Sequence, residues 1–581
     1  MSSMRVERKT DTKNGVARLV FVAISLTLQV AFFYFMWDWA SDYSIVLKIG
    51  TTVISAIVVL IIYGRHMTSS MKMPWLVMIA FLPILGIILW NLMESEAATG
   101  PMRRRFASIN ATLQIFLEQD DHVQEELRSA QSESCRVSEY LWRTGHYPLC
   151  RAEEATFYGD TREALKAQLA DLEKAEHFIF MEYYAIENRE AFAQVREVLR
   201  RKVQEGVEVR LFYDDVGSIG FITTNFARQL QEDGIDTRIF NKVMPSLRIF
   251  MNNRDHRKIT VIDGKIAFTG GYNLADEYFN ITHPYGEWSD AGIRITGPAV
   301  HTYTTLFLEM WNAIRNSDKD DTDFGRYFPG LKIPDEVLQL YLDRYSPEEI
   351  ATSIENWRAR QAALEPRDGE TVLCGASEPE QAKGQGSGSE GAPVRDYGPE
   401  FVQPYADSPL DEQQIGEDVY MTIVNSAERY VWFVTPYLIL TDEMSRCLTL
   451  AAERGVDVRI VTPGIPDKKI AYQLTRSYYA QLVCRGVRIY EFTPGFCHDK
   501  ICASDDRICT CGTINLDYRS LYHHFEDGCV MYSPRLCEDV KGKMEQMMSR
   551  CNEVTELYRK GQISLPLSVF RCMLRLFAPI M

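Results

Sequence analysis

The sequence carries little positive charge and no recognisable disulfide framework. Its 581 residues include 63 lysines and arginines against 79 aspartates and glutamates, which gives a formal net charge of −16. A chain with that charge has no global basic field, so we expect no nucleic acid among its partners. Its 13 cysteines show no paired spacing, which favours a reducing compartment over an oxidising one.

The most informative feature is a short pattern that occurs twice, 242 residues apart. Each copy has a His, a Lys two positions later, an Asp five positions after the Lys, and a Gly and an Asn seven and ten positions after the Asp. The members are His256, Lys258, Asp263, Gly270 and Asn273 in the first copy, and His498, Lys500, Asp505, Gly512 and Asn515 in the second. A single His-x-Lys is typical of any solvent-exposed strand, but the repeated spacing indicates a function.

The residue types in this pattern suit a phosphodiester. The neighbouring residues are apolar and β-branched, which predicts a strand on which the His and the Lys share one face. An imidazole can attack phosphorus or carry a proton, while an ammonium and an amide can bind the non-bridging oxygens. Two such sets would supply one His to attack phosphorus and one to protonate the leaving alkoxide. Because the lysines and the amides already compensate the charge of the phosphodiester, we expect no metal, and we expect no cofactor.

The repeat extends beyond the motifs and predicts two related α/β halves. Gly206–Arg210 matches Gly455–Arg459, and apolar runs precede both segments. Helices are expected over Glu190–Gln204 and Thr441–Arg454, which alternate with strands of a mixed sheet in each half. We place the halves at residues 151–364 and 401–560, and expect both motif histidines in one cleft between them.

Three further segments lie outside the two halves: a linker, a connecting segment and a C-terminal tail. Residues 365–400 are rich in Gly, Pro, Ser, Glu and Gln, which predicts a flexible linker. Residues 101–150 form a connecting segment. The apolar C-terminal tail, 561–581, is interrupted only by Arg571 and Arg575, and is either an interfacial amphipathic helix or a segment packed on the second half.

The first hundred residues form the predicted transmembrane region. Apolar runs at about 16–40, 44–63 and 73–93 are long enough for helices that cross the roughly 30 Å hydrocarbon core, with aromatic residues near their ends. No small-residue cleavage site follows the first run, so a signal peptide fits poorly. We predict a multi-pass protein of the bacterial cell (plasma) membrane.

Two topologies stay open. Arg5, Arg8, Lys9 and Lys13 place the N-terminus inside, and three full crossings would then put the catalytic halves outside. Alternatively, Pro83 and Gly86 break the third run into a re-entrant hairpin. Because basic residues follow that run and the cysteines favour a reducing interior, we expect the catalytic halves to face the cytoplasm.

The two motifs resemble the HKD motifs of the phospholipase D superfamily. Within it the chain looks like a bacterial cardiolipin synthase, and the resemblance runs from about residue 73 to the C-terminal tail. The strings that carry it are Met73–Gly86, Tyr213–Ser218, Asn252–Lys258 and Gly270–Tyr278, followed by Thr462–Lys469 and Gly512–Leu521. The resemblance implies two pseudo-symmetric phospholipase D-like halves with mixed β-sheets flanked by helices, preceded by N-terminal transmembrane helices.

The resemblance also implies a two-step phosphatidyl transfer between two phosphatidylglycerol molecules in the bilayer. His256 attacks the first and forms a phosphohistidine, while His498 protonates the departing glycerol and then deprotonates the second substrate. An acidic residue of the opposite half partners each His, and the matching positions are Glu526 for His256 and Asp290 for His498. Asp263 and Asp505 are expected to brace the motif loops.

Several positions depart from the family pattern. Gly271 and Thr513 stand where many members have Ser, which puts a phosphate contact by residue 271 in doubt. Four cysteines surround the second motif without a zinc-type spacing, so small core residues are expected there: Cys497, Cys502, Cys509 and Cys511. Candidates for binding the second headgroup are Arg254, Lys468, Lys469, Arg476 and Arg519.

The leading hypothesis competes with three others. A phospholipase D-type hydrolase, or a phosphatidyltransferase that uses another alcohol, would share the same motifs. A catalytically inactive membrane scaffold is disfavoured because both motifs are complete, and a nuclease is disfavoured by the acidic charge. The oligomeric state is left open.

Overall fold

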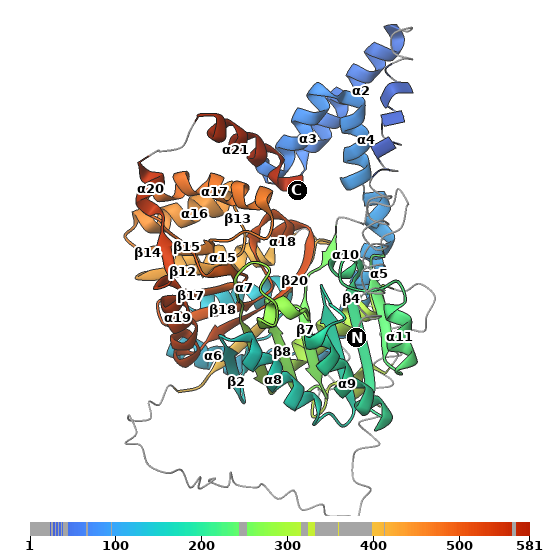
Figure 1. Ribbon diagram of the computed structural model, residues 1–581, viewed down its shortest axis with the longest axis vertical. Helices are drawn as coiled ribbons and strands as arrows, with labels where there is room; N and C mark the ends of the chain where they lie inside the picture. Colours follow the sequence, from blue (N-terminus) through green and yellow to red (C-terminus); the bar gives the residue numbers. More distant parts are fainter. Residues whose placement is uncertain are drawn as a thin grey trace, which may run out of the picture.

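A computed structural model describes most of the chain. The described residues are isolated positions between 24 and 38, then 45–65, 68–94, 96–242, 253–314, 323–331, 358, 398–411, 413–560 and 565–580. Two α/β lobes pack side by side, and a group of helices from the N-terminal region projects from one end (Figure 1). The predicted linker over 365–400 lies almost wholly outside the described residues.

The first half is built on a seven-stranded sheet, as counted over the described residues, in the order β2-β10-β8-β7-β3-β4-β5. Neighbours pair antiparallel except β3–β4–β5, which are parallel, so the sheet is mixed. The strands are β2 Ala155–Tyr158, β3 Phe178–Tyr183, β4 Glu208–Asp214, β5 Asp236–Phe240, β7 Lys258–Ile262, β8 Ile266–Gly270 and β10 Gly292–Thr296.

Helices cover both faces of this sheet. They are α8 Thr161–Leu172, α9 Glu190–Gln204, α10 Asp215–Ser218, α11 Phe226–Glu232 and α12 Val300–Ala313, with short 3-10 turns η3 Asp276–Phe279 and η4 Phe324–Tyr327. Helix α9 occupies the residues where a helix was expected, because Phe192, Val195 and Leu199 form one apolar stripe that is buried against the sheet. Helix α12 is buried along nearly its whole length, since it lies between the two halves.

The second half repeats this plan. Its strands are β11 Phe401–Asp407, β12 Tyr430–Val434, β14 Asp457–Pro463, β15 Arg488–Phe492, β17 Ile501–Ser504, β18 Ile508–Gly512, β20 His524–Tyr532 and β21 Cys551–Glu553. They follow the order β11-β20-β18-β17-β12-β14-β15-β21, and β1 (Cys150–Arg151) pairs with β11 at the edge. Strands β12, β14 and β15 are parallel and the other neighbours antiparallel, which makes this sheet mixed too.

The helices of the second half are α15 Ile415–Ser426, α16 Asp442–Glu453, α17 Lys469–Val483, α18 Tyr518–Tyr522, α19 Pro534–Met548 and α20 Thr555–Arg559. Thr441 caps α16 by accepting the backbone N–H of Met444, so this helix also starts where the sequence predicted. The connecting segment contains α5 Glu96–Leu113, η1 Gln114–Phe116, α6 Asp121–Ala130 and α7 Cys135–Gly145.

The two halves are joined by short strands that cross from one to the other. Strand β6 (Arg254–Asp255) of the first half pairs parallel with β20 of the second. Strand β16 (Gly495–Cys497) of the second half pairs parallel with β9 (Glu287–Ser289) of the first. One hydrophobic cluster contains residues of both halves, Phe180 and Phe525 among them. The fold is therefore α/β, with two similar halves that share a core.

The N-terminal region differs in part from the prediction. Helix α2 covers Ile45–Gly64, close to the expected 44–63, while the run predicted over 16–40 lies largely outside the described residues. The run predicted as one helix over 73–93 is instead α3 (Ser69–Phe81) and α4 (Pro83–Glu94). Pro83 causes the break, because it cannot donate the intrahelical hydrogen bond and it drives Leu82 out of helical geometry, to φ −134° and ψ 70°.

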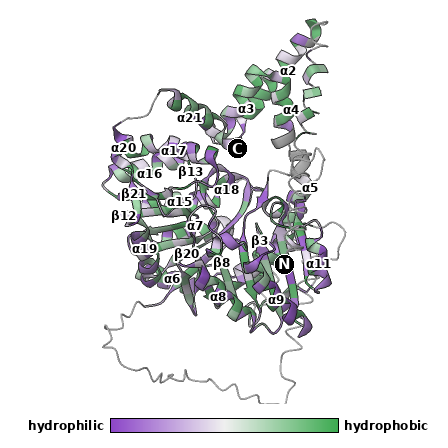
Figure 2. Cartoon of the chain, viewed as in Figure 1, coloured by the Kyte–Doolittle hydropathy of each residue, from purple (hydrophilic) through white to green (hydrophobic). Residues whose placement is uncertain are grey.

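Helices α3 and α4 fold against one another. A Cβ at Gly86 would lie 2.8 Å from the Cα of Ile79, so only glycine permits this approach. Green, hydrophobic residues predominate in α2 to α4 (Figure 2). No helix within the described ranges reaches the combination of length and apolar character that crossing a membrane requires.

The C-terminal tail forms helix α21 (Leu565–Phe577) and the turn η5 (Ala578–Ile580). Arg571 donates to the side-chain oxygen of Gln473 on α17, and Arg575 lies over the ring of Tyr478. Leu567, Val569, Phe570 and Met573 of the same helix are exposed to solvent. The tail therefore packs on the second half, while the interfacial role considered for it stays a prediction.

Candidate active site

Each motif histidine directly follows one of the short strands, β6 or β16, that cross the seam between the halves. His256 stands between β6 and β7, and its backbone N–H donates to the carbonyl of Phe525 at 2.9 Å. His498 stands between β16 and β17, and its N–H donates to the carbonyl of Ser289 at 2.7 Å. Each His is therefore held by the backbone of the opposite half, which brings two residues far apart in sequence into one centre.

Each imidazole contacts a carboxylate of the opposite half. Nδ1 of His256 lies 2.9 Å from Oε2 of Glu526, and Nδ1 of His498 lies 2.7 Å from Oδ2 of Asp290. Both carboxylates are fully buried. A carboxylate at Nδ1 keeps the proton on that nitrogen and leaves Nε2 free for chemistry. These are the partners that the family resemblance implied.

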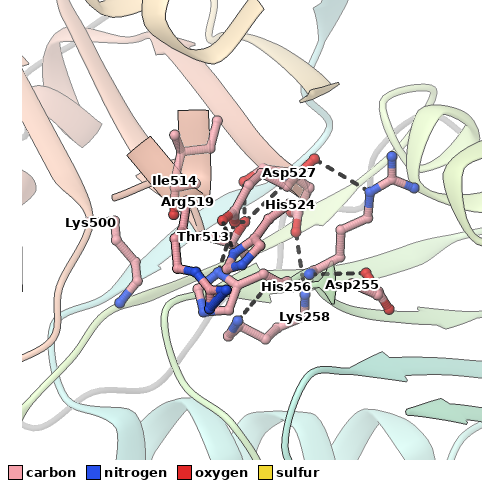
Figure 3. A network of polar contacts seen from close by, with 12 residues as sticks. Asp255, His256, Lys258, Lys500, Thr513, Ile514, Arg519, His524 and Asp527 are labelled. Atoms are coloured by element: carbon pink, nitrogen blue, oxygen red, sulfur yellow. Dashed lines mark hydrogen bonds and ion pairs between the residues drawn. The ribbon is translucent and has the colours of Figure 1, made fainter. Parts of the chain in front are cut away.

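Lys258 and Lys500 place two ammonium groups in the same buried centre (Figure 3). Each Nζ donates to the backbone carbonyl of its own motif His, and Nζ of Lys500 also lies 2.8 Å from Nδ1 of His498. Burial lowers the pKa of each lysine to about 8, although nearby carboxylates oppose the shift. At neutral pH both remain charged and suited to hold the oxygens of a phosphodiester.

Aromatic rings enclose both histidines. The ring of Tyr184 lies 5.0 Å from that of His256, while Tyr278 and Trp288 each lie 5.3 Å from that of His498. Burial, followed by the neighbouring lysines, lowers the pKa of both imidazoles well below the usual range. Both shifts favour the neutral imidazole, the form that a nucleophile or a general base must have.

The residues that follow the glycines differ between the halves. The hydroxyl of Thr513 donates to Oε2 of Glu526 and so supports the partner of His256. At the matching position a Cβ on Gly271 would lie 2.0 Å from Oδ1 of Asp290. The carboxylate of Asp290 occupies the space that a serine side chain would need, which explains the departure from the family pattern.

Asp263 and Asp505 lie at the far end of the motif strands and touch backbone. Asp263 accepts N–H groups of Glu176, His177 and Phe178, all at 2.8 Å. Asp505 accepts N–H groups from three consecutive residues of the second half, namely Glu428, Arg429 and Tyr430. Both aspartates have positive φ, 53° and 55°. Their contacts are those of a brace between neighbouring strands.

The two motif asparagines have different surroundings. Asn273 accepts the backbone N–H of Ala185 at 3.1 Å and donates to the hydroxyl of Tyr278 at 2.8 Å. It thereby links the backbone at Ala185 to Tyr278, whose ring lies beside that of His498. The Oδ1 atom of Asn515 is buried and has no hydrogen-bond partner among the described residues.

The five basic headgroup candidates separate into two groups. Arg254 is buried in an ion pair with Asp214, and Arg476 makes a bidentate pair with Glu491, so both have structural contacts. Lys468 and Lys469 are exposed. Lys468 contributes to the lowered pKa values of both histidines, and Arg519 contributes to the lowered pKa of His524, whose ring lies 5.5 Å from that of His256.

Sequence reasoning missed the residues that line the centre without belonging to a motif. Tyr184, Trp288 and His524 are the clearest examples. Trp288 and His524 each stand two positions before the acidic partner of a motif His. In the sequence, that shared spacing is the signal that could have identified Trp288 and His524.

One three-residue group among the described residues has donor atoms close enough for a metal ion, namely His256, His524 and Glu526. All three belong to the centre described above. The cysteines around the second motif, Cys497, Cys502, Cys509 and Cys511, are buried core residues.

Comparison with known proteins places this geometry in a family. Residues 169–311 and 420–548 match the family described as "Cardiolipin synthase, PLD-like domain". A cardiolipin synthase of Alkalihalophilus pseudofirmus is 27% identical over 523 residues, which is 90% of each chain. An uncharacterized protein of Streptococcus mutans serotype c is 33% identical over 90% of this chain and 99% of its own length. The chain belongs to the cardiolipin synthase family of the phospholipase D superfamily.

A solved structure shares the fold. The phosphatidylserine synthase of Haemophilus influenzae Rd KW20 aligns with a TM-score of 0.51 at 17% identity, over 77% of this chain and 99% of that one. The family match and the cardiolipin synthase relative confirm the predicted family and the predicted enzyme class, a phosphatidyltransferase.

Proposed function

We propose that this protein is a membrane-bound cardiolipin synthase. It transfers the phosphatidyl group of one phosphatidylglycerol to a second, and releases cardiolipin and glycerol. The observation that carries the proposal is the pair of imidazoles, each oriented at Nδ1 by a carboxylate of the opposite half, with two lysines in the same buried centre. This arrangement leaves two Nε2 atoms for two complementary tasks.

In the first step, the lone pair on Nε2 of His256 attacks phosphorus. The bond between phosphorus and the glycerol oxygen breaks, and Nε2–H of His498 gives its proton to that oxygen. The bound phosphodiester is negative, so it raises the pKa of His498 and favours the protonated form of that ring. Glu526 stabilises the positive charge that develops on the phosphorylated ring of His256.

In the second step, neutral His498 takes the proton from a hydroxyl of the second phosphatidylglycerol. The resulting alkoxide attacks phosphorus, and the bond between phosphorus and Nε2 of His256 breaks. Both histidines return to their starting states. One phosphodiester has been exchanged for another, so the step needs no nucleotide.

The membrane assignment is part of the proposal. Helix α2 exposes Ile49, Val53 and Ile57, and α21 exposes its own apolar face near the same end of the molecule. Such surfaces suit the boundary of a lipid bilayer, where the substrates reside. We propose a multi-pass location in the bacterial cell membrane, with the break at Pro83 as a re-entrant turn and the catalytic halves facing the cytoplasm. The free thiols of the described cysteines agree with that side.

The two lysines predict a pH dependence of substrate binding. Each ammonium is charged below its pKa of about 8 and neutral above it. The phosphodiester is therefore held more weakly as the pH rises through 8, and KM should increase up to about tenfold per pH unit for each lysine. Initial rates between pH 6.5 and 10 measure this. In a Lys258→Arg variant, whose side chain stays charged, the increase should be shallower; a KM that does not change with pH would contradict the role of the lysines.

The test of the function is mass spectrometry of lipids after the detergent-purified protein is incubated with phosphatidylglycerol alone. Cardiolipin and free glycerol in equal amounts are expected. Phosphatidic acid as the main product would identify a phospholipase D-type hydrolase. Cardiolipin that forms only when a different phospholipid is added would identify another donor. Turnover that survives in a His256→Ala variant would contradict the mechanism.

A further inference from the structure

The two halves place different rings beside their catalytic imidazoles. Trp288 and His524 occupy matching positions, each two residues before the carboxylate that partners a motif His. The ring of Trp288 lies 5.3 Å from that of His498, and the ring of His524 lies 5.5 Å from that of His256. The half that supplies Glu526 therefore adds a third imidazole to the centre, next to the histidine assigned to attack phosphorus.

His524 is buried and its polar atoms are unused. Its side chain is 9% exposed, and neither ring nitrogen has a hydrogen-bond partner among the described residues. Nδ1 points toward Oε1 of Glu526 at 3.5 Å, which is slightly too long for a hydrogen bond. Burial lowers the pKa of the ring to about 3, so the ring is neutral and carries one N–H.

The two oxygens of Glu526 have different surroundings. Oε2 contacts Nδ1 of His256 and accepts the hydroxyl of Thr513. Oε1 is buried and without a hydrogen-bond partner, and His524 is the imidazole that faces it. A donor at Oε1 would satisfy this buried oxygen and fix the rotation of the carboxylate, so that Oε2 stays aimed at His256.

We propose that His524 is a positioning residue for the phosphohistidine step. Its Nδ1–H donates to Oε1 of Glu526 when substrate is bound, and Glu526 in turn orients His256 and balances the charge that develops on it. Closing the gap requires a movement of about 0.6 Å to a normal hydrogen-bond length. The inference rests on the proposed function, because it concerns one step of that reaction.

The experiment is a double-mutant cycle between residues 524 and 526, measured as cardiolipin formation from phosphatidylglycerol. His524→Phe keeps a ring and removes the donor. It should lower kcat about 10- to 100-fold and leave KM within about twofold, since the lost hydrogen bond is to a charged group. His524→Asn, whose amide N–H replaces Nδ1–H, should recover most of the loss. In a Glu526→Gln background, His524→Phe should lower kcat by less than about threefold.

Trp288→Phe combined with Glu526→Gln is the matched control. Trp288 lies in the other half and contacts a different catalytic His, so the two effects should multiply. A His524→Phe loss of the same size in both backgrounds, or an Asn variant as slow as Phe, would overturn the proposal. If the Phe variant does not fold, His524→Gln takes its place, because its amide N–H lies at the position of Nε2 and not of Nδ1. The kcat of His524→Gln should be lower than that of His524→Asn. Equal kcat values for these two variants would also overturn the proposal.

These outcomes are separable from failure of the proposed function. If the unmodified protein makes no cardiolipin from phosphatidylglycerol, the function is wrong. If it does, and His524→Phe is as fast as the unmodified protein, only the role of His524 is wrong.

Discussion

Replacing either catalytic histidine with alanine should lower the rate of phosphatidyl transfer by about 10⁴-fold or more. His256→Ala removes the atom that bonds to phosphorus, and His498→Ala removes the proton carrier for both steps. Both rings lie in a preformed centre, so the variants should keep the fold. Product formation in detergent–lipid micelles measures the effect, and His122→Ala, a change at an exposed histidine, should leave the rate unchanged.

The two alanine variants should be blocked at different steps of the reaction. A phosphatidyl ester with a good leaving group, such as p-nitrophenol, needs no proton for the first step. His498→Ala should therefore release p-nitrophenol in a single burst, because His256 still attacks phosphorus while the second step lacks its base. His256→Ala should release none. The reverse pattern would exchange the two assigned tasks, and equal bursts would contradict a division of labour.

Asp263→Ala and Asp505→Ala should destabilise the fold by about 3 kcal/mol each. Each aspartate accepts three backbone N–H groups of the neighbouring strand's start, and alanine would leave them without a partner. Both positions also have positive φ, which alanine adopts at a further cost of about 1 kcal/mol. Thermal and denaturant unfolding of the detergent-solubilised protein measure the loss.

Asparagine at the same positions is the matched control. It retains one carbonyl oxygen and tolerates the left-handed backbone, so Asp263→Asn should lose clearly less stability than Asp263→Ala. An alanine variant with unchanged stability and no activity would show that Asp263 takes part in chemistry directly. That result would contradict the bracing role.

Much of the catalytic centre could be predicted from spacing because strand geometry is local. The motif His and Lys recur with fixed offsets, and their chemistry suits phosphate whatever the surrounding fold. The carboxylate partners could not be predicted from spacing. Glu526 lies 270 residues from His256, and only the resemblance to a family indicated it. Nothing local in the sequence specifies that β6 pairs with β20 across the seam, which is what brings these two residues together.

Other features depended on contacts that sequence patterns do not encode. The apolar run over 73–93 has the composition of one helix, but the constraint at Pro83 and the close approach of Gly86 to Ile79 divide it into two. His524 belongs to no motif and became visible only as the counterpart of Trp288. The asymmetry between Gly271 and Thr513 was evident in the sequence, while its cause, the space taken by Asp290, required the structure.

The central claim is that two halves form one centre in which His256 becomes covalently linked to phosphorus. The most direct test is to quench the enzyme in base during turnover of phosphatidylglycerol and to map the modified peptide by mass spectrometry. The account predicts a phosphatidyl group on the peptide that contains His256 and none on the peptide that contains His498. Modification of His498 instead, or turnover without any phosphohistidine, would contradict it.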